Sequence, residues 1–327
     1  MNPAEPLRWG ILGAARIARG ALVPAITGSR NGTVVAVASR SAERASAFAA
    51  ELGIRRAYGD YDALLADREV DAVYNALPNS EHSPLTLRAL AAGKHVLCEK
   101  PFAMNAAEAE AMDAEAKARG LVLMEAFMYR FHPQIERARA LVASGAIGQL
   151  RLVRGSFLFK FDRPGDIRWN PDLGGGALYD VGCYCVNAAR TFVGRDPVRV
   201  SGLATPASSG VDETFVGLLE FSDGVRSSFD CSFSLARHQR LDLIGTDGML
   251  TVTTPFTPGK VDTTLVLNGE SEVIPGSDQY RLMAEHFVDV VRGLASLRYP
   301  ASEATAQMRV LESLVRSSRN GQVVSLL

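Results

Sequence analysis

The sequence predicts an α/β protein in which a doubly wound parallel sheet precedes an α+β domain with a large open antiparallel sheet. Three observations support this prediction. A glycine turn follows the first apolar strand-like segment, strand-like and helical segments then alternate, and Asp-Gly and Asn-Gly turns separate the strand-like segments of the second half. The 327 residues, 47% of them hydrophobic, are sufficient for two cores, which we place at residues 1–125 and 126–327.

Composition and charge argue against several classes of protein. The 35 Lys and Arg residues nearly balance the 36 Asp and Glu residues, and no basic run is interleaved with aromatic residues, so we expect no nucleic-acid partner. No apolar segment approaches the roughly 20 residues of a membrane helix. Arg8, Arg16 and Arg19 interrupt the region where a signal peptide would be apolar, which predicts a cytoplasmic protein. The four cysteines include no CxxC pair, so neither a metal site nor a disulfide is expected.

Residues 7–18 read as a short strand, a tight turn and the start of a helix. This arrangement binds pyrophosphate in Rossmann folds, because the helix amino terminus offers unpaired backbone donors. Aligned on Gly13, the pattern G-x-G-x-x-G/A has Ala15 at its second glycine and Ala18 at its third. The Ala15 methyl group lies where the backbone approaches the cofactor, so we expect the phosphates to lie slightly farther from the loop. The predicted cofactor contacts are Gly13, Ala14, Ala15, Arg16 and Ile17.

The end of the second strand predicts the choice of cofactor. Residues 34–38 are strand-like, and Ser41 caps the following helix. NAD enzymes usually carry an acid at this strand end to bind the ribose hydroxyls, whereas this chain has Ser39 and Arg40, with Arg44 one helical turn later. Arginine presents a planar fork of donors suited to a 2′-phosphate, which predicts NADP(H) over NAD(H). Alternatively, Ser39 and Arg40 simply begin a solvated helix.

Two further strands are predicted at residues 70–76 and 95–98, with helices at about 60–66 and 83–92. A loop with turn-forming residues follows the strand at 70–76, at the edge of the sheet where the cofactor binds. We interpret His82 as a residue at the start of a helix rather than as a catalyst, and the helix at about 106–119 as scaffold. The predicted cofactor contacts in this loop are Leu77, Pro78, Asn79 and His82.

The most informative segment is Glu99-Lys100-Pro101, which ends the strand at 95–98. Pro101 removes a ladder donor and stops the strand, so Lys100 is placed at the carboxyl edge of the sheet, where open α/β folds bind ligands. We therefore expect all three residues to contact the cofactor and Lys100 also to contact the substrate. The alternative is a surface lysine held by Glu99.

The second half has the character of a large antiparallel sheet. Asp223-Gly224, Asp247-Gly248 and Asn268-Gly269 each lie between strand-like segments, which predicts consecutive hairpins. The strand-like segments are 151–161, 198–205, 214–221, 225–233, 240–245, 249–254 and 261–267.

One helix of this half, predicted at about residues 177–192, presents polar and ionisable side chains along one face. It follows three glycines, and Asp180, Tyr184 and Asn187 are spaced i, i+4 and i+7, which places them on one stripe. Alternatively, Asp180 is a first-turn acid favoured by the helix dipole and Tyr184 a boundary residue. We expect the three to contact the substrate, together with Phe157, Arg168 and Trp169, for which core or rim packing is the alternative.

Four segments resemble the Gfo/Idh/MocA family of oxidoreductases, and within it most closely the NADP-dependent dimeric dihydrodiol and D-xylose 1-dehydrogenases. They are the Gly13 loop, Glu99-Lys100-Pro101, residues 125–133 and residues 174–184. The resemblance implies catalytic roles for Lys100, for Tyr184 as acid/base and for Asp180 as the helix acid that supports substrate binding, and a cofactor contact at Arg130. It also implies a homo-oligomer, because the open sheet of the second domain commonly forms a dimer interface in this family.

These residues together predict an enzyme that moves a hydride between a sugar, such as D-xylose, or a related cyclic diol and NADP(H). A nearby ammonium group favours the phenolate form of tyrosine, so we assign Tyr184 as proton acceptor and Lys100 as its activator, although the two roles could be exchanged. The alternatives are a non-catalytic NAD(P)-binding sugar sensor, which an intact Lys100 and Tyr184 argue against, and a redox-neutral NAD-dependent glycosidase, which Arg40 disfavours.

Overall fold

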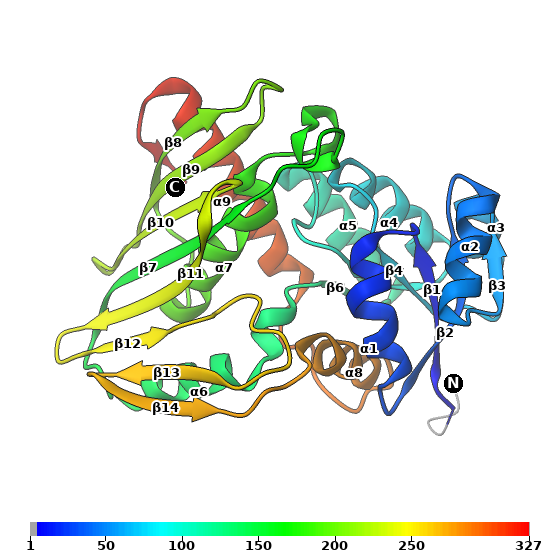
Figure 1. The fold of residues 1–327 in the computed structure, drawn as a ribbon, viewed down its shortest axis with the longest axis horizontal. Coiled ribbons are helices and arrows are strands. Elements are labelled where there is room, and N and C mark those ends of the chain that lie inside the picture. The colour runs from blue at the N-terminus through cyan, green and yellow to red at the C-terminus, as the bar shows by residue number, and fades with distance from the viewer. Residues whose placement is uncertain (1–4, 327) are drawn as a thin grey trace. The chain divides into compact units, whose positions relative to one another are not determined.

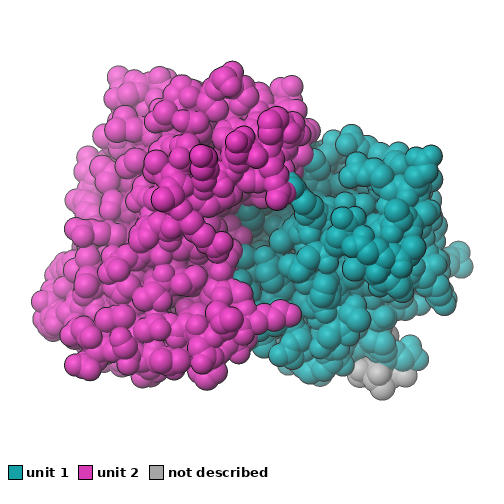
Figure 2. Space-filling model, viewed as in Figure 1, with its two compact units in different colours: residues 1–128, 278–305 teal, residues 129–277, 306–327 magenta. Residues whose placement is uncertain are grey.

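A computed structural model describes residues 5–326, and the chain divides into two compact units (Figures 1 and 2). Unit 1 contains residues 1–128 and 278–305, and unit 2 contains residues 129–277 and 306–327. This division differs from the single boundary expected after residue 125. The difference arises because helix α8 (Gln279–Val291) packs within unit 1, where the ring centroid of Phe287 lies 4.9 Å from that of Trp9.

Unit 1 is built on the predicted parallel sheet. Its six strands are ordered β3-β2-β1-β4-β5-β6, so the chain runs outward from β1 in one direction and then from β4 in the other. The two edge strands are only three residues long, and the sequence did not predict them. The strands are β1 (Leu7–Leu12), β2 (Gly32–Ala38), β3 (Arg56–Tyr58), β4 (Ala72–Asn75), β5 (His95–Cys98) and β6 (Leu123–Glu125).

The helices of unit 1 begin and end where the sequence provides caps. The side chains of Ser41, Asp60 and Asn105 accept hydrogen bonds from the first turns of α2, α3 and α5, while Gly53 and Gly120 end α2 and α5 in the left-handed conformation. Helices α1 and α8 pack together and against β2. The helices are a π-helical turn (Ala18–Leu22), α1 (Val23–Thr27), α2 (Ala42–Leu52), α3 (Tyr61–Ala66), α4 (His82–Ala91), α5 (Ala106–Arg119) and α8.

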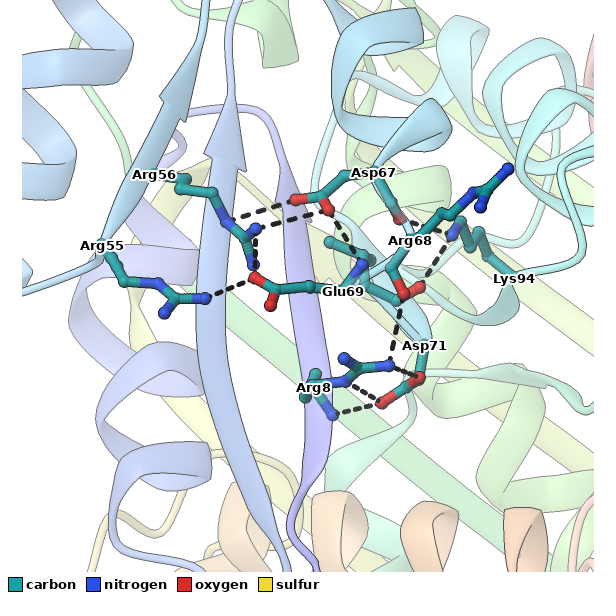
Figure 3. A network of polar contacts seen from close by, with 9 residues as sticks. Arg8, Arg55, Arg56, Asp67, Arg68, Glu69, Asp71 and Lys94 are labelled. Carbon is teal, nitrogen blue, oxygen red and sulfur yellow. Dashed lines mark hydrogen bonds and ion pairs between the residues drawn. The ribbon is translucent and has the colours of Figure 1, made fainter. Parts of the chain in front are cut away.

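The amino edge of this sheet, where the strands begin, is held by a network of ion pairs (Figure 3). Arg8 donates three hydrogen bonds to Asp71, at 2.7–3.0 Å, and Arg56 pairs with Asp67 at 3.2 Å. The ammonium group of Lys94 donates to the carbonyl oxygens of Asp67 and Val70, both at 2.8 Å. No predicted site residue belongs to this network, so we assign it to stability.

Replacing Asp71 by Asn is expected to lower stability at neutral pH by about 1 kcal/mol, because Arg8 is partly exposed to solvent. Burial opposes ionisation of Asp71, but the hydrogen bonds from Arg8 outweigh it and lower the pKa of the carboxyl group. A group with a lowered pKa stabilises the fold above its unfolded pKa, near 4, and loses that effect as the pH falls. Urea midpoints of the two proteins should therefore differ at pH 7 and approach each other as the pH falls below the folded-state pKa of Asp71. A difference of equal size at pH 7 and below that pKa would contradict this account.

Unit 2 contains a nine-stranded sheet ordered β14-β13-β12-β11-β7-β10-β9-β8-β15. The β7–β10 pair is parallel and the other pairs are antiparallel. All three predicted hairpins are confirmed, as β9–β10, β11–β12 and β13–β14. The strands are β7 (Leu150–Lys160), β8 (Arg199–Pro206), β9 (Asp212–Glu220), β10 (Arg226–Ser232), β11 (Ser234–Gly245), β12 (Met249–Val252), β13 (Thr263–Leu267), β14 (Glu270–Ile274) and β15 (Val324–Ser325).

Helix α7 (Cys183–Val193) packs on β7 and β10 and follows a π-helical turn at Leu178–Gly182. Small residues allow this close packing. A Cβ atom on Gly155 would lie 3.1 Å from Cβ of Cys185, and one on Gly182 would lie 2.7 Å from Sγ of Cys231. The remaining helices are α6 (Pro133–Ala143) and α9 (Ala301–Asn320). None of the helices within residues 5–326 combines the length and apolar character that a membrane span requires.

Candidate active site

The predicted cofactor loops of unit 1 follow the strands, at the carboxyl edge of the sheet. The loops after β1 and β4 adjoin, because a Cβ atom on Gly13 would lie only 2.9 Å from Cδ2 of Leu77. Gly13 also has a φ of +97°, a conformation that favours glycine. The Ala15 carbonyl group accepts an intrahelical hydrogen bond from Arg19, so the helix starts directly at this loop. A helix beginning beside the switch point of the sheet fits the diphosphate of a dinucleotide.

The end of β2 presents two arginines. Arg40 and Arg44 are exposed, whereas Ser39 is buried and its hydroxyl group accepts a hydrogen bond from the backbone of Ser41, at 3.4 Å. The sequence did not point to Tyr61, which lies near both guanidinium groups. Burial raises the pKa of Tyr61, and the charges of Arg40 and Arg44 act in the opposite direction. The end of β2 therefore places two guanidinium groups where the ribose of a dinucleotide binds in this type of fold.

The segment Glu99-Lys100-Pro101 follows β5 and is anchored by its acid. The Glu99 side chain is only 9% exposed and accepts hydrogen bonds from the Tyr74 hydroxyl group and from the Lys100 backbone, the latter at 3.3 Å. Tyr280 is also close, and burial, together with the charge of Glu99, raises its pKa well above the ordinary value. Glu99 is therefore a buried support of the Lys100 backbone, which differs from the surface pairing considered as the alternative.

His82 connects the loops after β4 and β5. Its side chain is fully buried, with Nδ1 2.8 Å from the carbonyl oxygen of Pro101 and Nε2 2.9 Å from that of Leu77. Burial lowers the pKa of His82 to about 4, so the ring is neutral at pH 7 and its single N–H group donates to one of these two carbonyl oxygens. The sequence predicted a cofactor contact here. The structure instead buries the ring between the carbonyl groups of Leu77 and Pro101, where it packs against both loops. Asn75 also helps to hold this turn, since its side-chain amide donates to the His82 carbonyl group at 3.1 Å.

In unit 2, three consecutive glycines determine the backbone path just before the helical segment that carries Asp180 and Tyr184. Gly174 ends a short turn at Pro171–Leu173 with a φ of +76°. A Cβ atom on Gly175 would lie 2.4 Å from the Arg168 carbonyl oxygen, and one on Gly176, whose φ is +115°, would lie 2.2 Å from Oδ1 of Asp212. No side chain fits at either position.

The sequence did not predict Asp212, which caps this helix. Its Oδ2 atom accepts a hydrogen bond of 2.6 Å from the backbone of Leu178. Burial raises the pKa of Asp212 to about 6, even though backbone hydrogen bonds from Ala177 and Leu178 favour its charged form. Asp212 and the glycines together fix the start of the helix that carries Asp180 and Tyr184.

Asp180 and Arg168 form an ion pair. The Nε atom of Arg168 donates to Oδ2 of Asp180 at 2.6 Å, and its Nη1 atom donates to Asp166 at 3.1 Å. The guanidinium group lies 4.9 Å from the ring centroid of Phe161, which in turn stacks on Trp169 at 6.3 Å. Burial disfavours the charged form of Arg168, but the two carboxylates outweigh it and raise the pKa of Arg168. The structure thus brings together the predicted residues Asp180, Arg168 and Trp169.

Tyr184 lies in a cluster of aromatic side chains and is 4% exposed. Its ring centroid is 5.8 Å from that of Tyr129, 5.5 Å from Phe157 and 5.4 Å from Phe256. Asn187, also buried, accepts a hydrogen bond of 2.7 Å from the Tyr129 hydroxyl group. Tyr184 and Asn187 therefore share a neighbour, as the predicted stripe requires, although Asp180 lies in the π-helical turn before α7.

Two members of this cluster, Tyr129 and Phe256, were not predicted. Tyr129 lies in the segment 125–133, whose alternating aromatic residues are a signal that could have pointed to it. Phe256 follows β12 in a loop that gave no signal. Arg130, predicted as a cofactor contact, is 5% exposed in the turn Met128–Phe131.

Comparison with protein families gives two matches. Residues 7–127 match the oxidoreductase family with an NAD-binding Rossmann fold, and residues 135–251 match the GFO/IDH/MocA C-terminal domain. Among curated proteins, the chain is 40% identical to D-xylose 1-dehydrogenase (NADP(+)) 2 of Haloferax volcanii, over 98% of this chain and 100% of that protein. It is also 40% identical to trans-1,2-dihydrobenzene-1,2-diol dehydrogenase of Mus musculus, over 82% of this chain and 80% of that protein.

Two solved structures of oxidoreductases align with nearly the whole chain. A 3-ketoreductase from Actinomadura kijaniata, in complex with NADP and TDP-benzene, superposes with a TM-score of 0.91 at 32% identity, covering 96% of this chain and 98% of that chain. An aldose-aldose oxidoreductase from Caulobacter crescentus, complexed with glycerol, also has a TM-score of 0.91, at 28% identity, covering 98% of this chain and 100% of that chain.

Proposed function

Because the chain belongs to the Gfo/Idh/MocA family of NAD(P)-dependent oxidoreductases, we propose that it transfers a hydride between NADP(H) and a sugar, such as D-xylose, or a related cyclic diol. The observation that carries the proposal is Tyr184, a phenol among aromatic rings that directly follows the π-helical turn carrying Asp180, the ion-pair partner of Arg168. The names of the relatives, a D-xylose dehydrogenase and a dihydrodiol dehydrogenase, support this substrate class. The test is turnover: purified protein is expected to reduce NADP⁺ in the presence of one class of aldose or vicinal diol.

The chain's own residues perform the proton transfer in this proposal. Tyr184 accepts the proton of the reacting hydroxyl group, and the Lys100 ammonium group stabilises the phenolate that is needed for this step. Asp180 binds the substrate. When bound, the nicotinamide supplies the acceptor for the hydride. Glu99 accepts a hydrogen bond from the Lys100 backbone, and His82 lies against the carbonyl group of Pro101, so both support the backbone from which the Lys100 side chain extends.

The loop after β1 would hold the diphosphate of the cofactor, and Ser39, Arg40 and Arg44 would hold its 2′-phosphate. The pair of exposed arginines supports NADP(H) as the preferred cofactor, and the NADP-dependent relative agrees with this choice.

Replacing Arg40 by Asp is expected to raise the dissociation constant for NADP⁺ by about a hundredfold and to improve binding of NAD⁺, because the new carboxylate repels a phosphate and accepts hydrogen bonds from ribose hydroxyls. Fluorescence titration with each cofactor measures both changes. Arg55→Asp serves as the control, since Arg55 is exposed and pairs with Glu69 at the amino edge of the sheet. If Arg40→Asp leaves the NADP⁺ affinity unchanged, the cofactor assignment is wrong.

We also propose that copies of the chain associate through the sheet of unit 2. Along β8 and β9 the side chains of Leu203, Val216 and Leu218 are 71%, 45% and 55% exposed, while their neighbours Phe215 and Leu219 are buried. Such an exposed apolar strip is typical of a surface that contacts another protein.

A further inference from the structure

The π-helical turn Leu178–Gly182 lies directly before the α-helix that carries Tyr184. It is closed by a hydrogen bond from the Cys183 backbone N–H group to the Leu178 carbonyl group, five residues earlier. Each residue of an α-helix rotates the chain by about 100°, and a π-helical turn contains one residue more than an α-helical turn. The width of this turn therefore determines how far the Tyr184 side chain is rotated from that of Asp180 about the helix axis.

Asp212 holds the beginning of the turn. Its Oδ2 atom accepts the 2.6 Å hydrogen bond from the backbone of Leu178, one of the first N–H groups of a helical segment, which have no acceptor within the segment itself. Asp212 is the first residue of β9, so this bond connects the turn to the sheet. The fold keeps this carboxylate although burial raises its pKa to about 6. Groups held in such unfavourable surroundings occur preferentially at functional sites.

Gln307 holds the end of the turn. This side chain of α9 is fully buried, and its Nε2 atom donates a hydrogen bond of 2.8 Å to the carbonyl oxygen of Cys183, the neighbour of Tyr184. Its Oε1 atom accepts a hydrogen bond of 3.1 Å from Nη1 of Arg190, farther along α7. The amide group thus connects two positions of α7 with α9, and it does so with one donor and one acceptor.

The middle of the turn packs on the sheet of unit 2, against β7, β9 and β10. Gly182 makes this possible, because a Cβ atom there would lie only 2.7 Å from Sγ of Cys231. The backbone of the turn is therefore fixed at its beginning, at its end and along the face that meets the sheet.

We infer that Asp212 and Gln307 are positioning residues for the proposed hydride transfer, because they hold the two ends of the π-helical turn and so set the orientation of Tyr184 relative to Asp180. This inference rests on the proposed function, in which Tyr184 is the proton acceptor. A general base must lie within hydrogen-bond reach of the proton that it accepts, and a displacement of about 1 Å can lower the rate about a hundredfold. Asp212 and Gln307 act on the reaction through the backbone of the turn.

Gln307→Glu is the sharpest variant, because it removes the donor to Cys183 while keeping the shape of the side chain and the acceptor for Arg190. The rate constant for hydride transfer is expected to fall about tenfold to a hundredfold. Stopped-flow absorbance under single-turnover conditions measures this step, with D-xylose, D-glucose, myo-inositol and trans-1,2-dihydrobenzene-1,2-diol as probes and NADP⁺ or NAD⁺ as cofactor. Loss of folded protein alone lowers the amplitude of the signal and leaves the rate constant unchanged.

Asp212→Ala and Asp212→Asn test the other end of the turn. The alanine variant removes both acceptor oxygens and is expected to lower the same rate constant by about tenfold to a hundredfold. The asparagine variant keeps one acceptor oxygen, so its rate constant should lie between those of Asp212→Ala and the wild type. It also provides the comparison if Asp212→Ala does not fold. NADP⁺ affinity, measured by fluorescence titration, should be unchanged in all three variants, since the proposed cofactor loops belong to unit 1.

Ser317→Ala is the matched control. Ser317 is a buried polar residue of the same helix as Gln307, and its hydroxyl group accepts a hydrogen bond of 3.1 Å from the backbone of Gly202 in β8. Loss of this bond should lower the unfolding midpoint and leave the rate constant for hydride transfer unchanged.

Two contrary results are distinguishable. If the wild-type protein oxidises a probe and the Gln307 and Asp212 variants keep its rate constant, or if Ser317→Ala lowers that constant as much as they do, this inference is wrong and the proposed function stands. If the wild-type protein oxidises none of the probes with either cofactor, the proposed function fails, and this inference fails with it.

Discussion

Replacing Tyr184 by Phe is expected to lower kcat by about 10²- to 10⁴-fold, the usual contribution of a positioned acid or base. The substitution removes only the phenolic hydroxyl group. The ring contacts with Tyr129, Phe157 and Phe256 can remain, so the helix and the aromatic cluster should keep their positions. Steady-state kinetics on the accepted substrate, together with fluorescence titration of NADP⁺, should show a large loss of kcat and a cofactor affinity within a few-fold of the wild type.

Tyr129→Phe is the matched control for this experiment. It removes a second phenolic hydroxyl group from the same cluster, together with the 2.7 Å hydrogen bond to Asn187. Loss of this buried hydrogen bond should cost about 1–2 kcal/mol of stability while kcat remains within about tenfold of the wild type. Near-wild-type turnover in Tyr184→Phe would remove Tyr184 from the mechanism, and an equal loss in both variants would show that the effect is structural.

Lys100→Met is expected to lower kcat by about 10²- to 10³-fold, because the uncharged side chain no longer favours the phenolate form of Tyr184. The pH dependence gives a second readout. Without a nearby ammonium group the pKa of the catalytic base rises, so residual activity should continue to increase at alkaline pH after that of the wild type has levelled off. A pH–rate profile between pH 6 and 11 measures this shift.

Lys94→Met is a closely matched control, because Lys94 and Lys100 flank the same strand, β5, at opposite ends. Lys94 donates to two backbone carbonyl groups at the amino edge of the sheet (Figure 3), so its replacement should lower the unfolding midpoint and leave kcat unchanged. Lys100→Met with unaltered kcat and an unaltered pH profile would exclude the assigned role.

The parts of the fold that local sequence determines could be predicted. The three hairpins follow from the Asp-Gly and Asn-Gly turns, and the parallel sheet follows from the alternation of strands and helices. The positions of Gly13 and Lys100 follow from the same reasoning, because residues just after parallel strands lie at one edge of the sheet.

The parts that depend on tertiary packing could not be predicted. Helix α8 belongs to unit 1 through contacts such as that of Phe287 with Trp9, which are distant in sequence. The edge strands β3 and β6 are too short to show a period.

The same limit applies to the candidate site. Arg168 and Asp180 were each predicted, but their pairing depends on a backbone turn that three glycines make possible. Tyr129 and Phe256 reach Tyr184 from separate segments, so no spacing along the chain connects them with it. His82 was assigned to the cofactor from its loop, whereas its burial shows a supporting position.

The most direct test of the central claim is an assay of hydride transfer by the purified wild-type protein. Formation of reduced nicotinamide should be followed by absorbance, with aldopentoses, aldohexoses, inositols and trans-dihydrodiols, using NADP⁺ and NAD⁺ in parallel. We predict turnover of one substrate class, with NADP⁺ preferred. Tight binding of NADP⁺ without turnover of any of these compounds would contradict the account and favour a sugar sensor or a redox-neutral glycosidase.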